Sequence, residues 1–142
     1  MRFLKREEET LAEKLGDFLT VFDTNIVIDY LKGNKKAIDT IQKYSPDGIA
    51  VTFINEYELL RYGEVEQIEN VFETLISKIK VYHTTDEAAI KAAQIYKKLK
   101  DKGNLVGEND ILIAGICLAN KETLVTNDND FKRLRIDSIV II

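Results

Sequence analysis

Residues 107–131 read GENDILIAGICLANKETLVTNDNDF and combine a helical segment, a strand and several acids. The run ILIAGICLA, residues 111–119, is apolar on every face, whereas a surface helix shows one polar face. We therefore expect a buried central helix there, opened by Asp110. Residues 124–126 then read as a strand, and Asp128 lies just after its end.

The rest of the chain alternates short apolar runs with helical patterns, which is typical of βαβ units. The expected strands are residues 18–22, 49–53, 81–82, 124–126 and 136–142. The other expected helices run from Thr24 or Asn25 to Gly33, from Asn55 onward, over residues 65–79, and from Thr84 to Gly103. The chain is thus predicted to be an α/β protein with a largely parallel sheet. No repeat or Ser/Gly-rich linker marks an internal domain boundary.

Acidic side chains follow three of the expected strands. Asp23, Glu58 and Asp128 come after strands, and ligands of open α/β sheets gather at the carboxyl ends of the strands. Asp110 begins a helix that is too apolar to lie outside the core, where an unpaired carboxylate is costly. Each acid alone also has a structural explanation, since Asp110 and Glu58 could cap helices and Asp23 could simply end a strand. Their joint placement favours one shared site.

Four converging carboxylates without basic partners repel one another, which raises their pKa values. A hard divalent cation such as Mg²⁺ or Mn²⁺ takes oxygen ligands and would relieve this repulsion. Such a site suits phosphodiester hydrolysis, because the ion lowers the pKa of a bound water and stabilises charge on the phosphate. This chemistry needs no His, Cys or Ser nucleophile, which agrees with a chain whose single histidine is His83.

Three segments resemble the signature blocks of PIN domains, and especially of VapC-type toxins from toxin–antitoxin pairs. They are FDTNIVIDYLKGN (22–34), INEYELLRYGE (54–64) and the stretch 107–131 quoted above. One block alone would be weak evidence. All three occur here in the order and spacing of the family.

The resemblance implies a three-layer α/β/α sandwich with a central, mostly parallel, Rossmann-like sheet. It implies an endoribonuclease that binds Mg²⁺ or Mn²⁺ through a cluster of acids and cleaves single-stranded RNA. It also implies a homodimer whose activity is held in check by a cognate antitoxin protein. By motif, the catalytic and metal-binding acids are Asp23 of DTN, Glu58 of ELL, Asp110 before ILIAG and Asp128 of TND.

Four more residues of the same motifs are expected to support the site. Thr126 and Asn127 directly precede Asp128 as polar helpers, and Asn25 is the last residue of DTN. Asp130 could assist Asp128 or take its place, and we rank it below Asp128.

The chain departs from the family pattern in two places. The family commonly begins within a few residues of its first strand, whereas here residues 1–16 precede it with a thin stripe of leucines. We predict a helical N-terminal extension over 1–16, packed on the domain or on a partner, and a single PIN-like domain over 17–142. Asn55 stands where the family often has Thr or Ser, three residues before the motif Glu. Asn caps a helix at least as well, so no loss of fold is expected.

The composition limits other functions. The content of 45% hydrophobic and 31% charged residues is ordinary for a soluble protein, no apolar run is long enough for a membrane helix, and the N-terminus lacks a secretory signal. We therefore expect a cytoplasmic protein without a membrane contact. The single Cys117 rules out an internal disulfide or a zinc site built from cysteines.

The charge balance constrains any contact with RNA. A net charge of −4 argues against broad attraction to a polyanion, so RNA must be met locally. The basic run KKLKDK (97–102) is either an ordinary solvated face or an RNA-guiding patch near the Asp110 loop. In the second interpretation Lys132, Arg133 and Arg135 would join it.

Three rival functions remain for comparison. The first is a PIN-type RNA-processing nuclease without an antitoxin, and the second is a non-catalytic module that binds RNA or protein. Loss of one acid would mark such a module, and all four are present. The third is a phosphatase with an aspartyl nucleophile. The sequence disfavours it, because DTN lacks a second acid two positions after Asp23.

Overall fold

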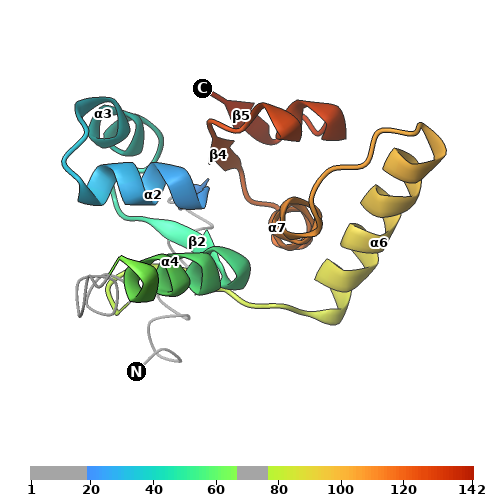
Figure 1. Ribbon diagram of the computed structural model, residues 1–142, viewed down its shortest axis with the longest axis horizontal. Helices are drawn as coiled ribbons and strands as arrows, with labels where there is room; N and C mark the ends of the chain where they lie inside the picture. Colours follow the sequence, from blue (N-terminus) through green and yellow to red (C-terminus); the bar gives the residue numbers. More distant parts are fainter. Residues whose placement is uncertain (1–18, 67–76) are drawn as a thin grey trace.

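The computed structural model describes residues 19–66 and 77–142 (Figure 1). The predicted extension over residues 1–16 therefore lies outside the described residues, as does Phe18 of the first expected strand. Most of the helix expected over 65–79 also falls outside them. No helix of the described ranges is both long and apolar enough to cross a membrane.

All strands of the sheet run parallel, in the order β3-β2-β1-β4-β5. The strands are β1 (Val21–Phe22), β2 (Ala50–Thr52), β3 (Lys80–Tyr82), β4 (Leu124–Thr126) and β5 (Ile139–Ile141). The helices are α2 (Thr24–Leu31), α3 (Lys35–Tyr44), α4 (Phe53–Val65), α6 (Asp86–Asp101) and α7 (Glu108–Ala119), with a 3-10 helix η1 (Asn129–Leu134). Val21 is in register with Ala50 on one side and Leu124 on the other. The carboxyl ends of β1, β2 and β4 therefore meet at one edge of the sheet.

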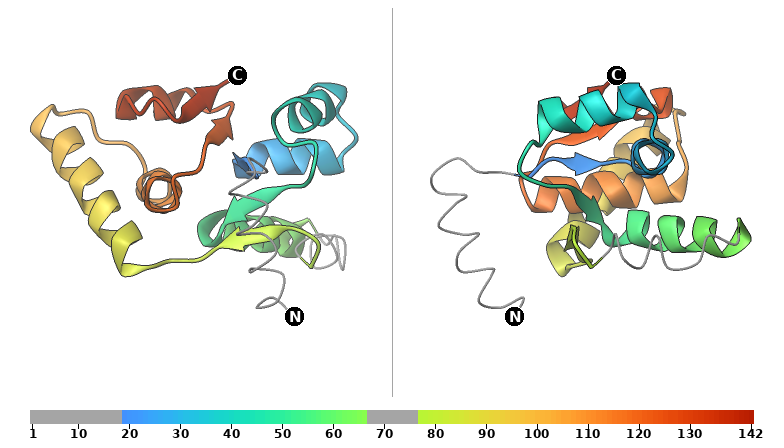
Figure 2. Two further views of the ribbon diagram at one scale, coloured as in Figure 1. Left: turned by 180° about the vertical axis from the view of Figure 1, so that it is seen from behind. Right: turned by 90° about the vertical axis from the view of Figure 1, so that its left-hand side faces the viewer.

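Helices cover both faces of this sheet, which confirms the predicted three-layer α/β/α sandwich (Figure 2). Successive residues of a strand point to opposite faces. Phe22 packs with α2, α3 and α4 on one face, while Val21 packs with α6 and α7 on the other. The run 111–119 forms most of α7, with Ile113 and Ile116 fully buried, so the predicted central helix is also confirmed.

Several expected element ends were wrong because side-chain caps lie elsewhere. The helix expected from Asn55 begins at Phe53, because Thr52 is its N-cap and Asn55 completes a capping box from the third helical position. Glu58 therefore lies in the second turn of α4, and not in the first turn, where a helix beginning at Asn55 would put it. Asp23, rather than Thr24 or Asn25, caps α2. Thr85, one residue later than expected, caps α6.

Three of the strands are shorter than the sequence suggested, whereas β3 begins one residue earlier than expected. The first expected strand reduces to Val21–Phe22 and keeps its expected end. The second reduces to Ala50–Thr52, and it loses Phe53 because α4 begins there. The last expected strand reduces to Ile139–Ile141. Only Leu124–Thr126 matches its expected bounds at both ends.

The helices α6 and α7 approach each other closely at Gly115. A Cβ built at Gly115 would lie 2.8 Å from the backbone oxygen of Ala88 and 2.8 Å from the Cβ of Ala92. Real Cβ atoms do not approach backbone so closely, so any side chain here must push the helices apart. Since α7 also carries Asp110, this contact fixes the position of an acid that the sequence analysis singled out.

We expect Gly115→Ala to lower the free energy of unfolding by about 1–3 kcal/mol, because overpacking outweighs the helix propensity gained. Urea unfolding followed by circular dichroism measures the change. Ala93→Leu enlarges an exposed residue of α6 and should alter stability by no more than about 0.5 kcal/mol. Equal unfolding midpoints for Gly115→Ala and wild type would contradict the close contact.

Candidate active site

All four predicted acids line a single cleft of about 320 Å³. Asp23 follows β1, Glu58 projects from α4, Asp110 lies in the first turn of α7, and Asp128 follows β4. The cleft is completed by Thr24, Asn25, Ile28, Arg61, Tyr62 and Val65. The parallel register explains the convergence, because it brings the ends of neighbouring strands to the same edge.

Asp23 is the most deeply placed of these acids, with 6% of its surface exposed. Its Oδ2 accepts a hydrogen bond of 2.7 Å from the Thr126 hydroxyl, and its Oδ1 accepts one of 2.9 Å from the Thr24 backbone N–H. The Asn55 amide donates a longer bond of 3.3 Å to Oδ1. Burial raises the pKa of Asp23, and the bonds from Thr126 and Thr24 oppose that rise. The donors hold this carboxylate in a fixed orientation.

A chain of polar side chains holds Glu58 beside Asp23. The buried Asn55 amide donates a 3.0 Å bond to the Thr24 hydroxyl. That hydroxyl donates a 2.7 Å bond to Glu58 Oε1. On the other carboxylate oxygen, Asn109 Nδ2 donates a long bond of 3.4 Å to Oε2. Glu58 thus has one oxygen held firmly and one held weakly.

Asp110, Asp128 and Asp130 form the most crowded group of acids. Each offers one carboxylate oxygen, and these atoms lie within 4.8 Å of one another. Burial, together with the charges of Asp128 and Asp23, raises the pKa of Asp110 from 3.8 to about 7. No side chain forms an N-cap hydrogen bond at the start of α7, so helix capping alone does not explain Asp110.

The supporting residues of the sequence analysis divide into two groups. Thr126 bonds Asp23, its oxygen also accepts the backbone N–H of Asp128, and Asn25 lines the cleft. Asp130 joins the crowded group. Asn127 is exposed, and its side chain makes no hydrogen bond to the acids in the described part of the chain. It is the one candidate that the structure does not bring to the cluster.

Sequence reasoning missed several polar residues of the site, including Arg61, which lines the cleft. Thr24 and Asn55 were expected only as helix caps, and Asn109 was not singled out. Asn55 is fully buried, and its contacts with Asp23 and Thr24 depend on strand order. A buried polar residue beside two motif acids was a possible signal, but burial of Asn55 cannot be read from the sequence.

The donor set fits a hard divalent cation. The cluster offers only oxygen atoms, and Mg²⁺, Ca²⁺ and Mn²⁺ prefer such ligands. Burial is the main cause of the raised pKa values of Asp23 and Asp110, and the neighbouring carboxylates raise them further. Arg61 is the only Lys or Arg among the lining residues of the described chain. A cation would supply the missing positive charge.

Comparison with known proteins identifies the fold family. The family model described as PIN domain matches residues 20–137, which include every acid of the cleft. The chain belongs to the PIN-domain family. The parallel α/β/α architecture of this PIN domain is shared by solved structures of VapC-type proteins.

Two curated relatives of this PIN domain carry the name ribonuclease VapC. Ribonuclease VapC1 of Methanocaldococcus jannaschii is 28% identical over 139 residues, which are 95% of this chain and 93% of the relative. Ribonuclease VapC3 of the same organism is 30% identical over 96 residues, covering 68% of this chain and 95% of the relative. The likeness extends over nearly the full length of both relatives.

Solved structures give the same assignment. DNA-bound VapBC from Salmonella typhimurium has a TM-score of 0.73 and 30% identity, covering 88% of this chain and 98% of that chain. VapBC-1 from nontypeable Haemophilus influenzae has a TM-score of 0.71 and 25% identity, covering 83% of this chain and 93% of that chain. This PIN domain is therefore of the VapC type.

The raised pKa of Asp110 predicts how stability depends on pH without metal. Folded protein keeps this proton up to about pH 7, whereas the unfolded chain releases it near 3.8. The contribution of Asp110 to stability is fully present below about pH 4 and is lost as the pH rises through about 7. We expect Asp110→Asn to lose less stability over this range than wild type, as measured by urea unfolding in EDTA.

Asp39→Asn, which removes an exposed acid of α3, is the matched control and should follow wild type across the range. Parallel pH profiles for wild type and Asp110→Asn would contradict the crowding of Asp110.

Proposed function

We propose that this protein is a metal-dependent endoribonuclease that cleaves single-stranded RNA in the acidic cleft. The observation that carries the proposal is the meeting of Asp23, Glu58, Asp110 and Asp128 in one cleft from four separate elements. Two relatives that are 28% and 30% identical to this chain are named ribonucleases, which supports the same activity. A module that only binds RNA or protein would have no need of this unbalanced negative charge.

Asp110, Asp128 and Asp130 are the residues that would hold Mg²⁺ or Mn²⁺, with Asp23 at the deep side of the cleft. When bound, the ion supplies positive charge that activates water for attack and stabilises charge on the phosphate. Asp110 binds a proton near neutral pH when the cleft lacks a cation, so cation binding competes with that proton.

The remaining residues orient groups in the cleft. Thr126 and Asn55 keep the Asp23 carboxylate from rotating. Glu58 Oε1 is engaged by Thr24, while Oε2 receives only the long bond from Asn109. Oε2 is therefore the atom of Glu58 that can accept a proton from an attacking water. Arg61 lies at the same cleft and can bind a phosphate oxygen of the substrate.

We expect labelled single-stranded RNAs to be cut in the presence of Mg²⁺ or Mn²⁺, and not in EDTA. Asp110→Asn and Asp128→Asn should each reduce the rate by at least about 100-fold, the scale on which one electrostatic group acts in other active sites. The assay is gel electrophoresis of a panel of RNAs. Asp39→Asn carries the same change in charge outside the cleft and should cut as wild type does.

Cutting that survives Asp110→Asn and Asp128→Asn would place the reaction elsewhere, or in a contaminant. A panel on which wild type cuts nothing, with Mn²⁺ bound, would favour the non-catalytic module instead.

We further propose that the nuclease acts in the cytoplasm as the toxin of a toxin–antitoxin pair, as a homodimer. The support is the likeness to solved VapBC structures, two of which are described as bound to DNA or to promoter DNA. The runner-up is a PIN-type RNA-processing nuclease that has no antitoxin. A nuclease for RNA maturation would be tolerated by its host, whereas a toxin would not.

Induced expression of wild type in a bacterial host should stop growth within a few generations, because RNA cleavage would be unchecked. Asp110→Asn at equal protein level should leave growth unchanged. Optical density and an immunoblot provide the measurement. Normal growth with abundant, active wild type would contradict the toxin role and support the processing nuclease.

A further inference from the structure

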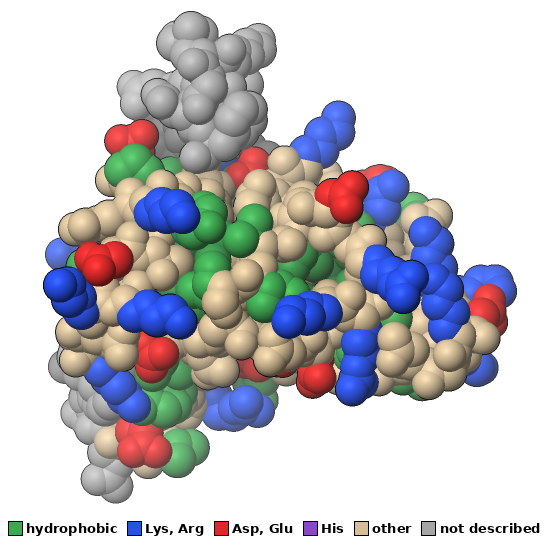
Figure 3. Space-filling view, turned by 90° about the horizontal axis from the view of Figure 1, so that it is seen from above, with side chains coloured by type: hydrophobic (Ala, Val, Ile, Leu, Met, Phe, Trp, Pro, Cys, Tyr) green, Lys and Arg blue, Asp and Glu red, His purple; other side chains and the backbone are tan. Residues whose placement is uncertain are grey.

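A second hollow of about 270 Å³ lies between α6 and the end of η1, outside the acidic cleft. Its lining includes Lys91, Lys98, Lys102, Arg133 and Arg135, with aliphatic side chains between them and no acid. We call this the basic groove. Figure 3 shows Lys and Arg side chains gathered at the right-hand end of the molecule, over α6. The chain as a whole carries −4, so this concentration of positive charge is local.

The helix α6 builds one wall of the basic groove. Lys91, Lys98 and Lys102 are spaced by seven and four residues, which puts them on one side of a helix. At 1.5 Å per residue this stripe extends for about 16 Å. That length exceeds a single phosphate and suits an extended polyanion.

The other wall is held in place by backbone contacts. Arg133 Nη1 donates a 3.3 Å bond to the carbonyl oxygen of Leu105, in the loop between α6 and α7. Arg135 ends η1 in a left-handed conformation with φ of 51°, and its N–H bonds the Lys132 carbonyl oxygen. The two arginines therefore face α6 from a defined turn.

Arg133 also joins the basic groove to the acidic cleft. Its Nη2 lies 3.9 Å from Asp130 Oδ1, and Asp130 belongs to the crowded group with Asp110 and Asp128. This pair is half exposed, so it contributes more to position than to stability. An RNA strand lying in the basic groove would reach the acids by passing Arg133.

Most of the positive charge in the basic groove is available to a ligand. Lys91 has a loose ion pair with Glu87 at 3.8 Å. Lys98, Lys102 and Arg135 have no ion pair with any described residue. Like charges placed together without partners repel one another, and a bound polyanion would remove that repulsion.

We propose that the basic groove binds the sugar–phosphate backbone of the RNA on one side of the bond to be cut and guides it past Arg133 to the acids. The inference rests on the proposed ribonuclease function and deepens it, because it names a substrate track beyond the cleft. Binding here reads charge and not base sequence, so it depends strongly on salt.

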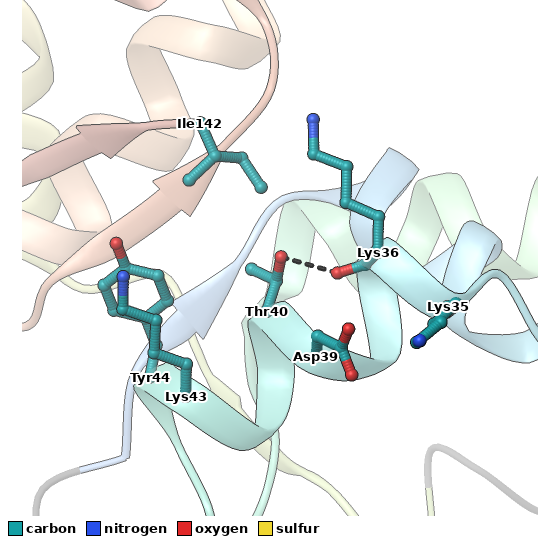
Figure 4. Close-up of a pocket in the computed structure, with 7 residues that line it drawn as sticks. All are labelled: Lys35, Lys36, Asp39, Thr40, Lys43, Tyr44 and Ile142. Carbon is teal, nitrogen blue, oxygen red and sulfur yellow. Dashed lines mark hydrogen bonds between the residues drawn. The ribbon is translucent and has the colours of Figure 1, made fainter.

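The test compares two triple variants that remove the same charge. The groove variant is Lys98→Gln/Lys102→Gln/Arg135→Gln. The control is Lys35→Gln/Lys36→Gln/Lys43→Gln, at the lysine-rich hollow beside Ile142 (Figure 4). That hollow contains Asp39 and shares no lining residue with the acidic cleft. The two triple variants have the same net charge, so any difference in their RNA affinity shows where on the surface the removed charges matter.

Binding of a labelled single-stranded RNA is measured by fluorescence anisotropy in EDTA, where nothing is cut. The groove variant should bind the RNA at least about 10-fold more weakly than wild type. The slope of log K against log salt concentration should become less negative by about 2, because three phosphate contacts are lost. The control should bind within about 2-fold of wild type at the same salt. A Lys98→Arg/Lys102→Arg variant should bind as wild type does.

Equal loss in both triple variants would assign the effect to net charge and overturn the proposal. An RNA affinity of the groove variant equal to that of wild type would also overturn the proposal. If the groove variant instead loses binding to poly-glutamate, the basic groove would be a site for an acidic protein segment. A double variant without the Arg135 change applies the same test should the triple variant unfold. If wild type cuts no RNA with Mn²⁺ bound but the groove variant still loses RNA affinity, the nuclease proposal fails and the basic groove stands as an RNA site.

Discussion

The need to stabilise the Asp23 carboxylate at the centre of the sheet shapes this site. A carboxylate buried without donors is costly, and Asp23 receives its donors from each neighbouring element. They come from Thr126 at the end of β4, from the first N–H of α2, and from Asn55 in α4. Any change in strand order or register would leave the group unsatisfied. Asp23 thus links the fold to the geometry of the cleft.

Two opposing electrostatic arrangements lie close together on the chain. The cleft gathers acids whose charge the protein leaves unbalanced, and the basic groove gathers cations that are largely without partners among the described residues. The short helix η1 connects them, with Asp130 near its start and Arg133 one turn later. This arrangement lets an acidic protein meet a polyanion at one place without attracting it over its whole surface.

The sequence predicted the fold class, the buried helix α7 and the convergence of four acids, because these follow from apolar periodicity and from strand ends. It placed the caps of α2, α4 and α6 wrongly. Several Ser, Thr, Asp and Asn residues compete for each cap, and the winner depends on strand length and burial. The hydrogen bonds from Asn55 to Thr24 and from Thr24 to Glu58 join residues that are far apart in the sequence. They could not be predicted without knowing the fold.

The bond between Thr126 and Asp23 spans 103 positions of the sequence. Because β1 pairs with both β2 and β4, the centre of the sheet is completed only when β4, about 100 residues later in the sequence, is added. During synthesis, a chain that stops before residue 124 lacks the hydroxyl that orients Asp23 and also lacks Asp128. The order of translation itself therefore delays assembly of the acidic cleft until Thr126 and Asp128 have been synthesised.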